Sequence, residues 1–415
     1  MFEPLEQPQF VQVLLSIPLI GRFVLLAIVG ALAAVVINWL ARRLAVFGGA
    51  AGRVATVRWW LVAAGCAAGL PGLYWWEVVR AGLLPEGLPP IGPPGAAGTA
   101  FALTILHQQF VAHAVLIGLM LVASLIDLDE KLIPDAITIP GALIGLLLAA
   151  VWPYSLLPAL IVPAGAEVMP GFWGLFAGGQ VDWPVLHAAA PGEWPEWMGR
   201  DGGVAGLLLA VGCWWGWCLA LMPRHWYPRH GYRRAAALML ARLRRSWETY
   251  GLLAAAIFGT VAIALVWAWT VTAWRGLATA LIGMAVGGGI IWAVRIVGTW
   301  ALRREAMGFG DVTLMAMIGT FIGWQSCLLV FFMAPLAGLV VGIIQLIASR
   351  EAEIPYGPFL CLASLVLIVF WAPIWAWAWG IFALGWLLAA ILFFCMLLMG
   401  AMLGMWMVAR TRLGI

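Results

Sequence analysis

Two groups of carboxylates stand beside long apolar runs in this 415-residue sequence. Residues 126–135 hold Asp127 and Asp129 directly after one apolar run, and residues 307–311 (MGFGD) end in Asp311 directly before another. Ionisable groups beside a membrane span are costly, so their presence suggests function. Two carboxylates that share one proton suit peptide hydrolysis, because the ionised one takes a proton from water while the protonated one polarises the carbonyl.

Other hydrolytic and metal chemistry finds little support in the sequence. The five histidines lie away from any credible serine or cysteine nucleophile, and the six cysteines form no CxxC pair. Single thiols within apolar runs are typical of small buried hydrophobes. We therefore expect no metal site, no disulfide framework and no cofactor.

The composition identifies the solvent around these carboxylates as lipid. The chain is 65% hydrophobic and 10% charged, with a mean hydropathy of +1.03, whereas soluble domains are about 45–50% apolar and about 25% charged. The arginines sit between apolar spans and form no single basic face, so nucleic acid is not an expected partner.

A membrane helix needs about 20 apolar residues, and this criterion predicts an all-α polytopic membrane protein with about eleven transmembrane helices. The expected spans are 12–40, 58–76, 101–126, 136–152, 203–222, 251–273, 276–300, 312–324, 327–348, 358–376 and 380–408. Arginine clusters recur at every second connection, which predicts the N-terminus outside and the C-terminus inside. Both carboxylate groups then lie at the cytoplasmic boundary.

Four regions are expected along the chain. Residues 1–100 form N-terminal spans, and residues 101–152 hold the first aspartate helix and the span after it. Residues 153–250 form an insertion with an outer loop, a span and an Arg-rich cytoplasmic segment. Residues 251–415 hold the MGFGD motif and the C-terminal spans.

Three stretches carry a resemblance to a known family. Residues 124–145 (SLIDLDEKLIPDAITIPGALIG) resemble the first aspartate motif of the type IV prepilin peptidases, and residues 307–325 (MGFGDVTLMAMIGTFIGWQ) are similar to their GxGD motif. Residues 354–360 (IPYGPFL) resemble the cytoplasmic loop of that family. The two aspartate motifs, in this order, are highly specific.

The resemblance implies an aspartyl endopeptidase of a bacterial inner membrane with Asp127 and Asp311 as its catalytic pair. It implies prepilin or pseudopilin precursors as substrates, cut between a basic leader and an apolar helix. The residues implied in substrate binding are Gly308, Gly310, Asp129, Pro355, Gly357 and Pro358.

The sequence departs from the family in two places. Bacterial members usually carry two CxxC pairs, which bind zinc, in the loop after the first span, but residues 41–57 hold no Cys, His, Asp or Glu. Tetrahedral zinc needs four such ligands, so we expect leader cleavage without methylation of the new N-terminus. The second departure is the insertion at 153–250.

Alternatives remain open at this point. A broader GxGD protease would cut other membrane helices, and a transporter would carry charges near the centres of several spans. Asp135, which follows Pro134, is expected to cap the helix after it, and His107 and His113 are expected to be structural.

Overall fold

The computed structural model describes residues 9–45, 52–89, 91, 98–161, 172, 184–222, 246–303, 305, 307–348 and 355–413. Regular structure within these residues is helical, apart from a single antiparallel bridge between Pro158 and Val185. The expected all-α class is confirmed for this part of the chain. Residues 223–245, which make up most of the predicted Arg-rich segment, lie outside it.

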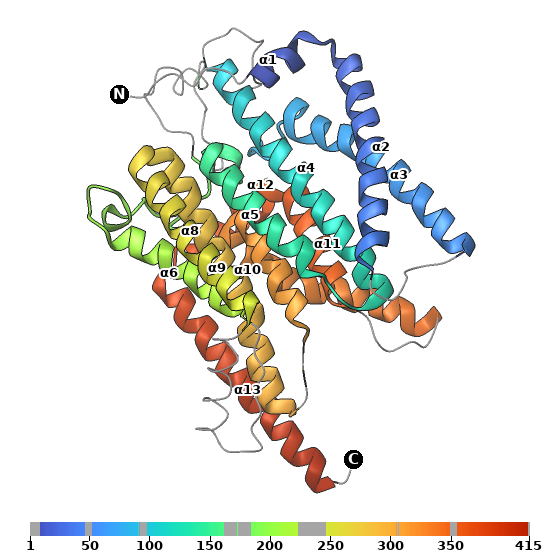
Figure 1. Ribbon diagram of the computed structural model, residues 1–415, viewed down its shortest axis with the longest axis vertical. Coiled ribbons are helices and arrows are strands. Elements are labelled where there is room, and N and C mark those ends of the chain that lie inside the picture. The colour runs from blue at the N-terminus through green and yellow to red at the C-terminus, as the bar shows by residue number, and fades with distance from the viewer. Residues whose placement is uncertain are drawn as a thin grey trace.

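The helices follow the apolar runs of the sequence (Figure 1). In chain order they are α1 Gln9–Ser16, α2 Leu19–Leu44, α3 Gly52–Tyr74, the π-helix η1 Trp75–Val79, α4 Thr99–Glu130, α5 Asp135–Val151, the short η2 Pro153–Ser155 and η4 Glu196–Met198, α6 Ala205–Ala220, α8 Trp247–Trp269, α9 Val271–Leu302, α10 Phe309–Ala348, α11 Gly357–Val369, α12 Trp371–Phe382 and α13 Trp386–Leu413.

Six of the described helices are long and apolar enough to cross a membrane, and α11 with α12, bent by 97°, makes a seventh if the pair counts as one span. Only 11% of the apolar 18-residue stretch of α13 is buried inside the protein, so most of the apolar surface of this helix suits contact with lipid. The chain is therefore a multi-pass membrane protein. The eleven spans and their orientation stay predictions, since α5 and α6 have only 17 and 16 residues.

The chain turns back on itself within α10. Gly323 has a non-helical backbone with φ 77° and ψ 169°, a conformation that glycine adopts without steric cost. A Cβ at Gly319 would lie 3.1 Å from Cys327 Sγ, although eight residues of unbroken helix would rise about 12 Å. The break that the sequence predicts near 324–327 is therefore a reversal at Gly323.

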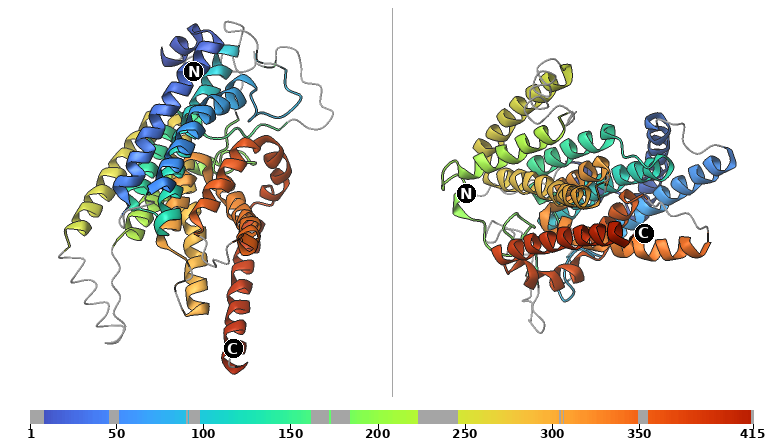
Figure 2. Two further views of the ribbon diagram at one scale, coloured as in Figure 1. Left: turned by 90° about the vertical axis from the view of Figure 1, so that its right-hand side faces the viewer. Right: turned by 90° about the horizontal axis from the view of Figure 1, so that it is seen from below.

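Helices α9 and α10 form the centre of the molecule. α10 packs against α5, α9 and α11, and α4 packs against α2, α5 and α11. Figures 1 and 2 show that α1 and the C-terminal end of α13 lie at opposite ends. We call the end of the bundle that holds Asp127 and Asp311 the aspartate end, and the end that holds α12 and residues 184–203 the distal end.

Candidate active site

Asp127 lies in the last turn of α4. The helix ends because Lys131 adopts a left-handed conformation (φ 53°) and its backbone N–H donates to the carbonyl oxygen of Asp127 at 2.8 Å. Apolar residues dominate α4 before this point, and its buried residues continue as far as Asp127 in the last turn. Asp127 is only 5% exposed, which places a carboxylate at the edge of the buried core.

Asp311 lies in the first turn of α10 and is 8% exposed. A helix N-terminus favours a negative charge, because the first backbone N–H groups have no partners within the helix. Asp311 and Asp127 lie beside the same residue, Ile133: a Cβ at Gly310, next to Asp311, would lie 2.9 Å from Ile133 Cβ, and a Cβ at Gly357, which lies against Asp127, would lie 2.7 Å from Ile133 Cδ1. The structure thus brings together two carboxylates that the sequence separates widely.

The glycines of the MGFGD motif differ in what surrounds them. A Cβ at Gly310 would lie 2.9 Å from Cβ and 3.1 Å from the carbonyl oxygen of Ile133, so the absent side chain admits the turn between α4 and α5. A Cβ at Gly308 would lie 3.7 Å from Asp311 Oδ2, an ordinary contact. Gly310 therefore packs against this chain itself, while Gly308 faces open space beside the Asp311 carboxylate.

Arg295 of α9 holds the segment that leads into Asp311. Its Nε donates to the carbonyl oxygen of Met307 at 2.9 Å, and its Nη2 pairs with Glu305 Oε1 at 2.6 Å. The guanidinium carbon also lies 5.6 Å from the centroid of the Phe309 ring. One arginine therefore contacts three residues around the motif.

Gly357 begins α11 and lies against Asp127. A Cβ at Gly357 would lie 2.5 Å from Asp127 Oδ2, and the neighbouring Pro355 and Pro358 are half-buried. Burial, with a smaller contribution from the charge of Asp311, raises the pKa of Tyr356 to about 12. Tyr356 is therefore a neutral phenol beside the two carboxylates.

Asp129 forms an ion pair with Arg58 of α3. Arg58 Nη1 lies 2.5 Å from Asp129 Oδ2, and both side chains are partly exposed. Residues two apart on a helix point in different directions, which explains why Asp129 faces Arg58 while Asp127 faces the core. The pair joins the ends of two helices at the aspartate end.

Asp135 does not cap α5 as predicted. The N-cap residue is Pro134, whose ring has no oxygen that could accept a hydrogen bond from the helix, and Asp135 is the first helical residue. Thr313 Oγ1 lies 3.4 Å from Asp135 Oδ1 and 3.0 Å from the carbonyl oxygen of Gly310. The prediction was wrong because Thr313 of α10, distant in sequence, contacts the carboxylate.

The histidines of α4 lie within the buried helix interface, as expected of structural residues. His113 Nδ1 lies 2.8 Å from Glu77 Oε1, and both side chains are fully buried. His107 Nε2 lies 3.2 Å from the hydroxyl oxygen of Tyr74. Among the described residues no group of three or more His, Cys, Asp or Glu has an arrangement that would hold a metal ion.

Comparison with known proteins finds a family match for part of the chain. Residues 247–343 match the model of the type IV leader peptidase family. The matched stretch contains Asp311 and Arg295, whereas Asp127 lies outside it.

The chain carries a type IV leader peptidase region.

Curated relatives of the chain bear the name prepilin leader peptidase/N-methyltransferase. One from Aeromonas salmonicida is 30% identical over 108 residues, which are 24% of this chain and 36% of the relative. One from Pseudomonas aeruginosa is 35% identical over 94 residues (22% and 32%), and one from Escherichia coli is 32% identical over 90 residues (21% and 40%). The chain thus matches well under half of each relative's length. No solved structure gives a significant match.

Two residues around the leader peptidase region were missed by sequence reasoning. Arg295 stood out as a charged residue inside an apolar run, but nothing in the sequence tied it to Met307. Tyr356 lay inside a recognised stretch without a role of its own. Both contacts depend on how α9, α10 and α11 meet, which no local pattern encodes.

Proposed function

We propose that this protein is an aspartyl endopeptidase that removes the basic leader from type IV prepilin or pseudopilin-like precursors at the cytoplasmic face of a bacterial inner membrane. One observation supports the proposal: the carboxylates of Asp127 and Asp311 are both buried at one end of a helical membrane bundle, near the same turn at Ile133. The names of the relatives support the same substrate class for the leader peptidase region.

The chemistry follows from the sharing of one proton. The ionised carboxylate takes a proton from water, and the hydroxide so formed attacks the carbonyl carbon of the scissile bond. The protonated carboxyl donates to the carbonyl oxygen and stabilises the charge that develops there. As the C–N bond breaks, the carboxyl group that took the proton from water gives it to the amine nitrogen, which leaves, and the hydroxyl of the intermediate returns its proton to the other carboxylate. Like charges held close together favour a single shared proton.

The location of the pair suits a substrate with two different halves. An apolar helix of the precursor lies in lipid beside the bundle, while a basic leader stays in water beyond the headgroups. The bond between the halves then lies at the boundary, at the depth of the aspartate end. In this proposal Gly308 leaves space beside Asp311 for the substrate backbone, and Pro355, Gly357 and Pro358 form the adjacent wall.

The test is incubation of the purified full-length protein with a synthetic peptide that joins a basic leader to an apolar helix, followed by mass analysis. We expect one cut at the junction. Equal cleavage of an apolar helix without a leader would favour a broader GxGD protease, and no cleavage at all would favour a transporter.

The same assay decides the methylation prediction. With S-adenosylmethionine supplied, we expect an unmodified new N-terminus, because residues 41–57 contain no zinc ligands. The relatives are named as methyltransferases as well, so their purified proteins serve as positive controls. A product heavier by one methyl group would contradict the prediction and leave the peptidase proposal intact.

A further inference from the structure

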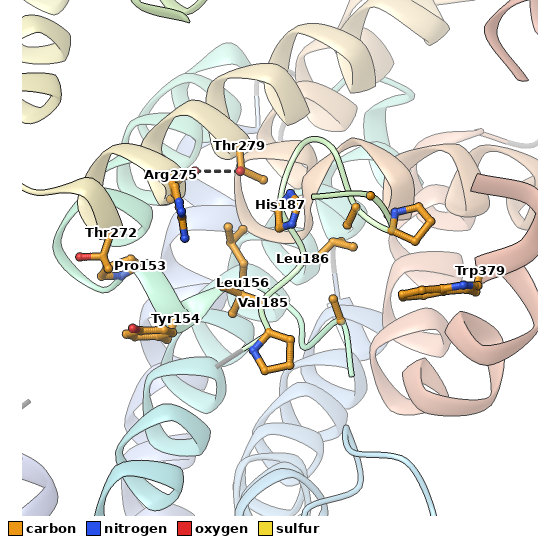
Figure 3. Close-up of a pocket in the computed structure, with 16 residues that line it drawn as sticks. Pro153, Tyr154, Leu156, Val185, Leu186, His187, Thr272, Arg275, Thr279 and Trp379 are labelled. Carbon is orange, nitrogen blue, oxygen red and sulfur yellow. Dashed lines mark hydrogen bonds between the residues drawn. The ribbon is translucent and has the colours of Figure 1, made fainter. Parts of the chain in front are cut away.

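A second candidate site, with a mostly apolar lining and a few polar groups, lies at the distal end. A cavity of about 230 Å³ opens between the start of α9, the segment that follows α5, and residues 184–192 (Figure 3). α9 lines it with Thr272, Arg275 and Thr279, which share one face of the helix. Figure 3 shows His187 on the loop beside Arg275 and Thr279, and Trp379 of α12 on the far side.

The loop backbone around this cavity is held by hydrogen bonds from side chains of the helices. Backbone carbonyl groups of the loop accept hydrogen bonds from side-chain N–H groups on three helices, α4, α10 and α12. These bonds are Gln109 to Leu156 (2.9 Å), Trp371 to Pro158 (2.6 Å), Trp324 to Ala188 (2.7 Å), and Gln325 to His187 (2.8 Å) and Ala190 (3.1 Å). Polar loop backbone at a membrane boundary needs such partners, and here they preform the cavity.

Two basic side chains, Arg275 and His187, line the cavity. Arg275 has a guanidinium that is always charged. Burial, with a smaller contribution from the charge of Arg275, lowers the pKa of His187 to about 4, so its imidazole is neutral at pH 7. The backbone N–H of Ala189 donates to Nδ1 of His187 at 3.3 Å. The ring proton is therefore on Nε2, which is a donor.

The remaining lining is mostly apolar and brings no negative charge. The sixteen described residues that line the cavity include no Asp or Glu. Arg275 is the fifth residue of α9, close to the positive end of that helix's dipole. A guanidinium fork and a neutral imidazole donor are groups that proteins use to bind oxyanions, whereas the hydroxyl of Thr279 already donates to the carbonyl oxygen of Arg275.

The depth of the cavity indicates which oxyanion is available. α9 has 32 residues and is about 48 Å long at 1.5 Å per residue, whereas the hydrocarbon core is about 30 Å thick. An end of α9 must project into the headgroup layer. The aromatic rings of Tyr154 and Trp379 beside the cavity are typical of that layer, where lipid phosphates are concentrated.

We propose that this distal cavity binds a phosphate-bearing anion, with Arg275 as its ion-pair partner and Nε2 of His187 as a second donor. Lipid headgroups and free phosphate offer the same chemistry. The proposal is independent of the peptidase reaction, since none of the cavity residues contacts the two aspartates.

Binding is measured by calorimetry on the full-length protein, purified in a phosphate-free maltoside detergent. One arm uses short-chain phosphatidylglycerol and the other uses inorganic phosphate. We expect the wild type to bind in at least one arm, and the arm identifies the source. Arg275→Gln should raise the Kd at least tenfold. The matched control is Arg200→Gln, which removes an exposed charge at the same end outside the cavity and should leave the Kd unchanged.

Two milder variants keep the test valid if Arg275→Gln fails to fold. Arg275→Lys keeps the charge but loses the planar fork, and His187→Phe keeps an aromatic ring but loses the donor, so each should weaken binding severalfold. No binding by the wild type in either arm, or equal binding by the variants and the wild type, would overturn the proposal.

Discussion

Gly357 and Asp127, which belong to different helices, lie so close that no side chain fits between them: a Cβ on Gly357 would be 2.5 Å from Asp127 Oδ2. The start of α11 therefore forms a wall against one of the two carboxylates. Any change at this wall must move the carboxylate or the helix, and this makes Gly357 a sensitive probe of the proposed chemistry.

Gly357→Ala should lower leader cleavage about 100-fold while the protein still folds, because a displacement of about 1 Å at a reacting group has an effect of that size. Gly118→Ala is the matched control. Gly118 lies on the same helix as Asp127 and has nothing within 4 Å of an added Cβ, so its activity should stay at the wild-type level. Cleavage rates measured by mass analysis decide between them, and full activity in Gly357→Ala would refute the close contact.

Asp127→Asn and Asp311→Asn should each lower cleavage by about 100-fold to 10,000-fold, since neither half of an acid–base pair works alone. Removing a buried charge that faces another like charge should not unfold the protein. Asp201→Asn, at an exposed position of the distal end, is the control and should cleave normally. The assay needs cells or membranes without other prepilin peptidases, and wild-type activity in either aspartate variant would exclude that residue from catalysis.

Arg295→Ala should lower the cleavage rate about tenfold with little change in KM. The variant loses the hydrogen bond to Met307 and the ion pair with Glu305, and hydrogen bonds to charged groups contribute about 1.5–3 kcal/mol. The comparison is Arg303→Asn, which removes a charge at the end of the same helix and suits its left-handed backbone. Equal rates for the two variants would show that the Arg295 contacts do not position Asp311.

Asp129→Asn should raise the KM for a basic leader about threefold to fivefold and leave kcat unchanged. Arg58→Gln should lower the KM, because it removes a positive charge that lies beside Asp129 and would compete with the basic leader. Exposed ion pairs contribute only about 0.2–1 kcal/mol, so neither variant should change stability greatly. Kinetics with leaders of different charge test this, and a KM that is independent of leader charge in the wild type would remove Asp129 from substrate binding.

The sequence by itself determined the membrane class, the helical fold and the two candidate aspartates. These features depend on local properties: apolar runs of membrane length predict helices, and a carboxylate beside such a run is costly wherever the chain folds. The order of the two aspartate motifs along the chain could also be read from the sequence. The break near Gly323 also has a local cause, since glycine tolerates a positive φ there.

Only the tertiary structure decided which groups meet. Asp135 contacts Thr313, Asp129 pairs with Arg58, and Arg295 donates a hydrogen bond to Met307. Each contact joins residues on different helices or on either side of a turn, and the packing of whole helices sets their distance. Side-chain periodicity determines which face of a helix is apolar, but it does not encode which neighbour covers that face.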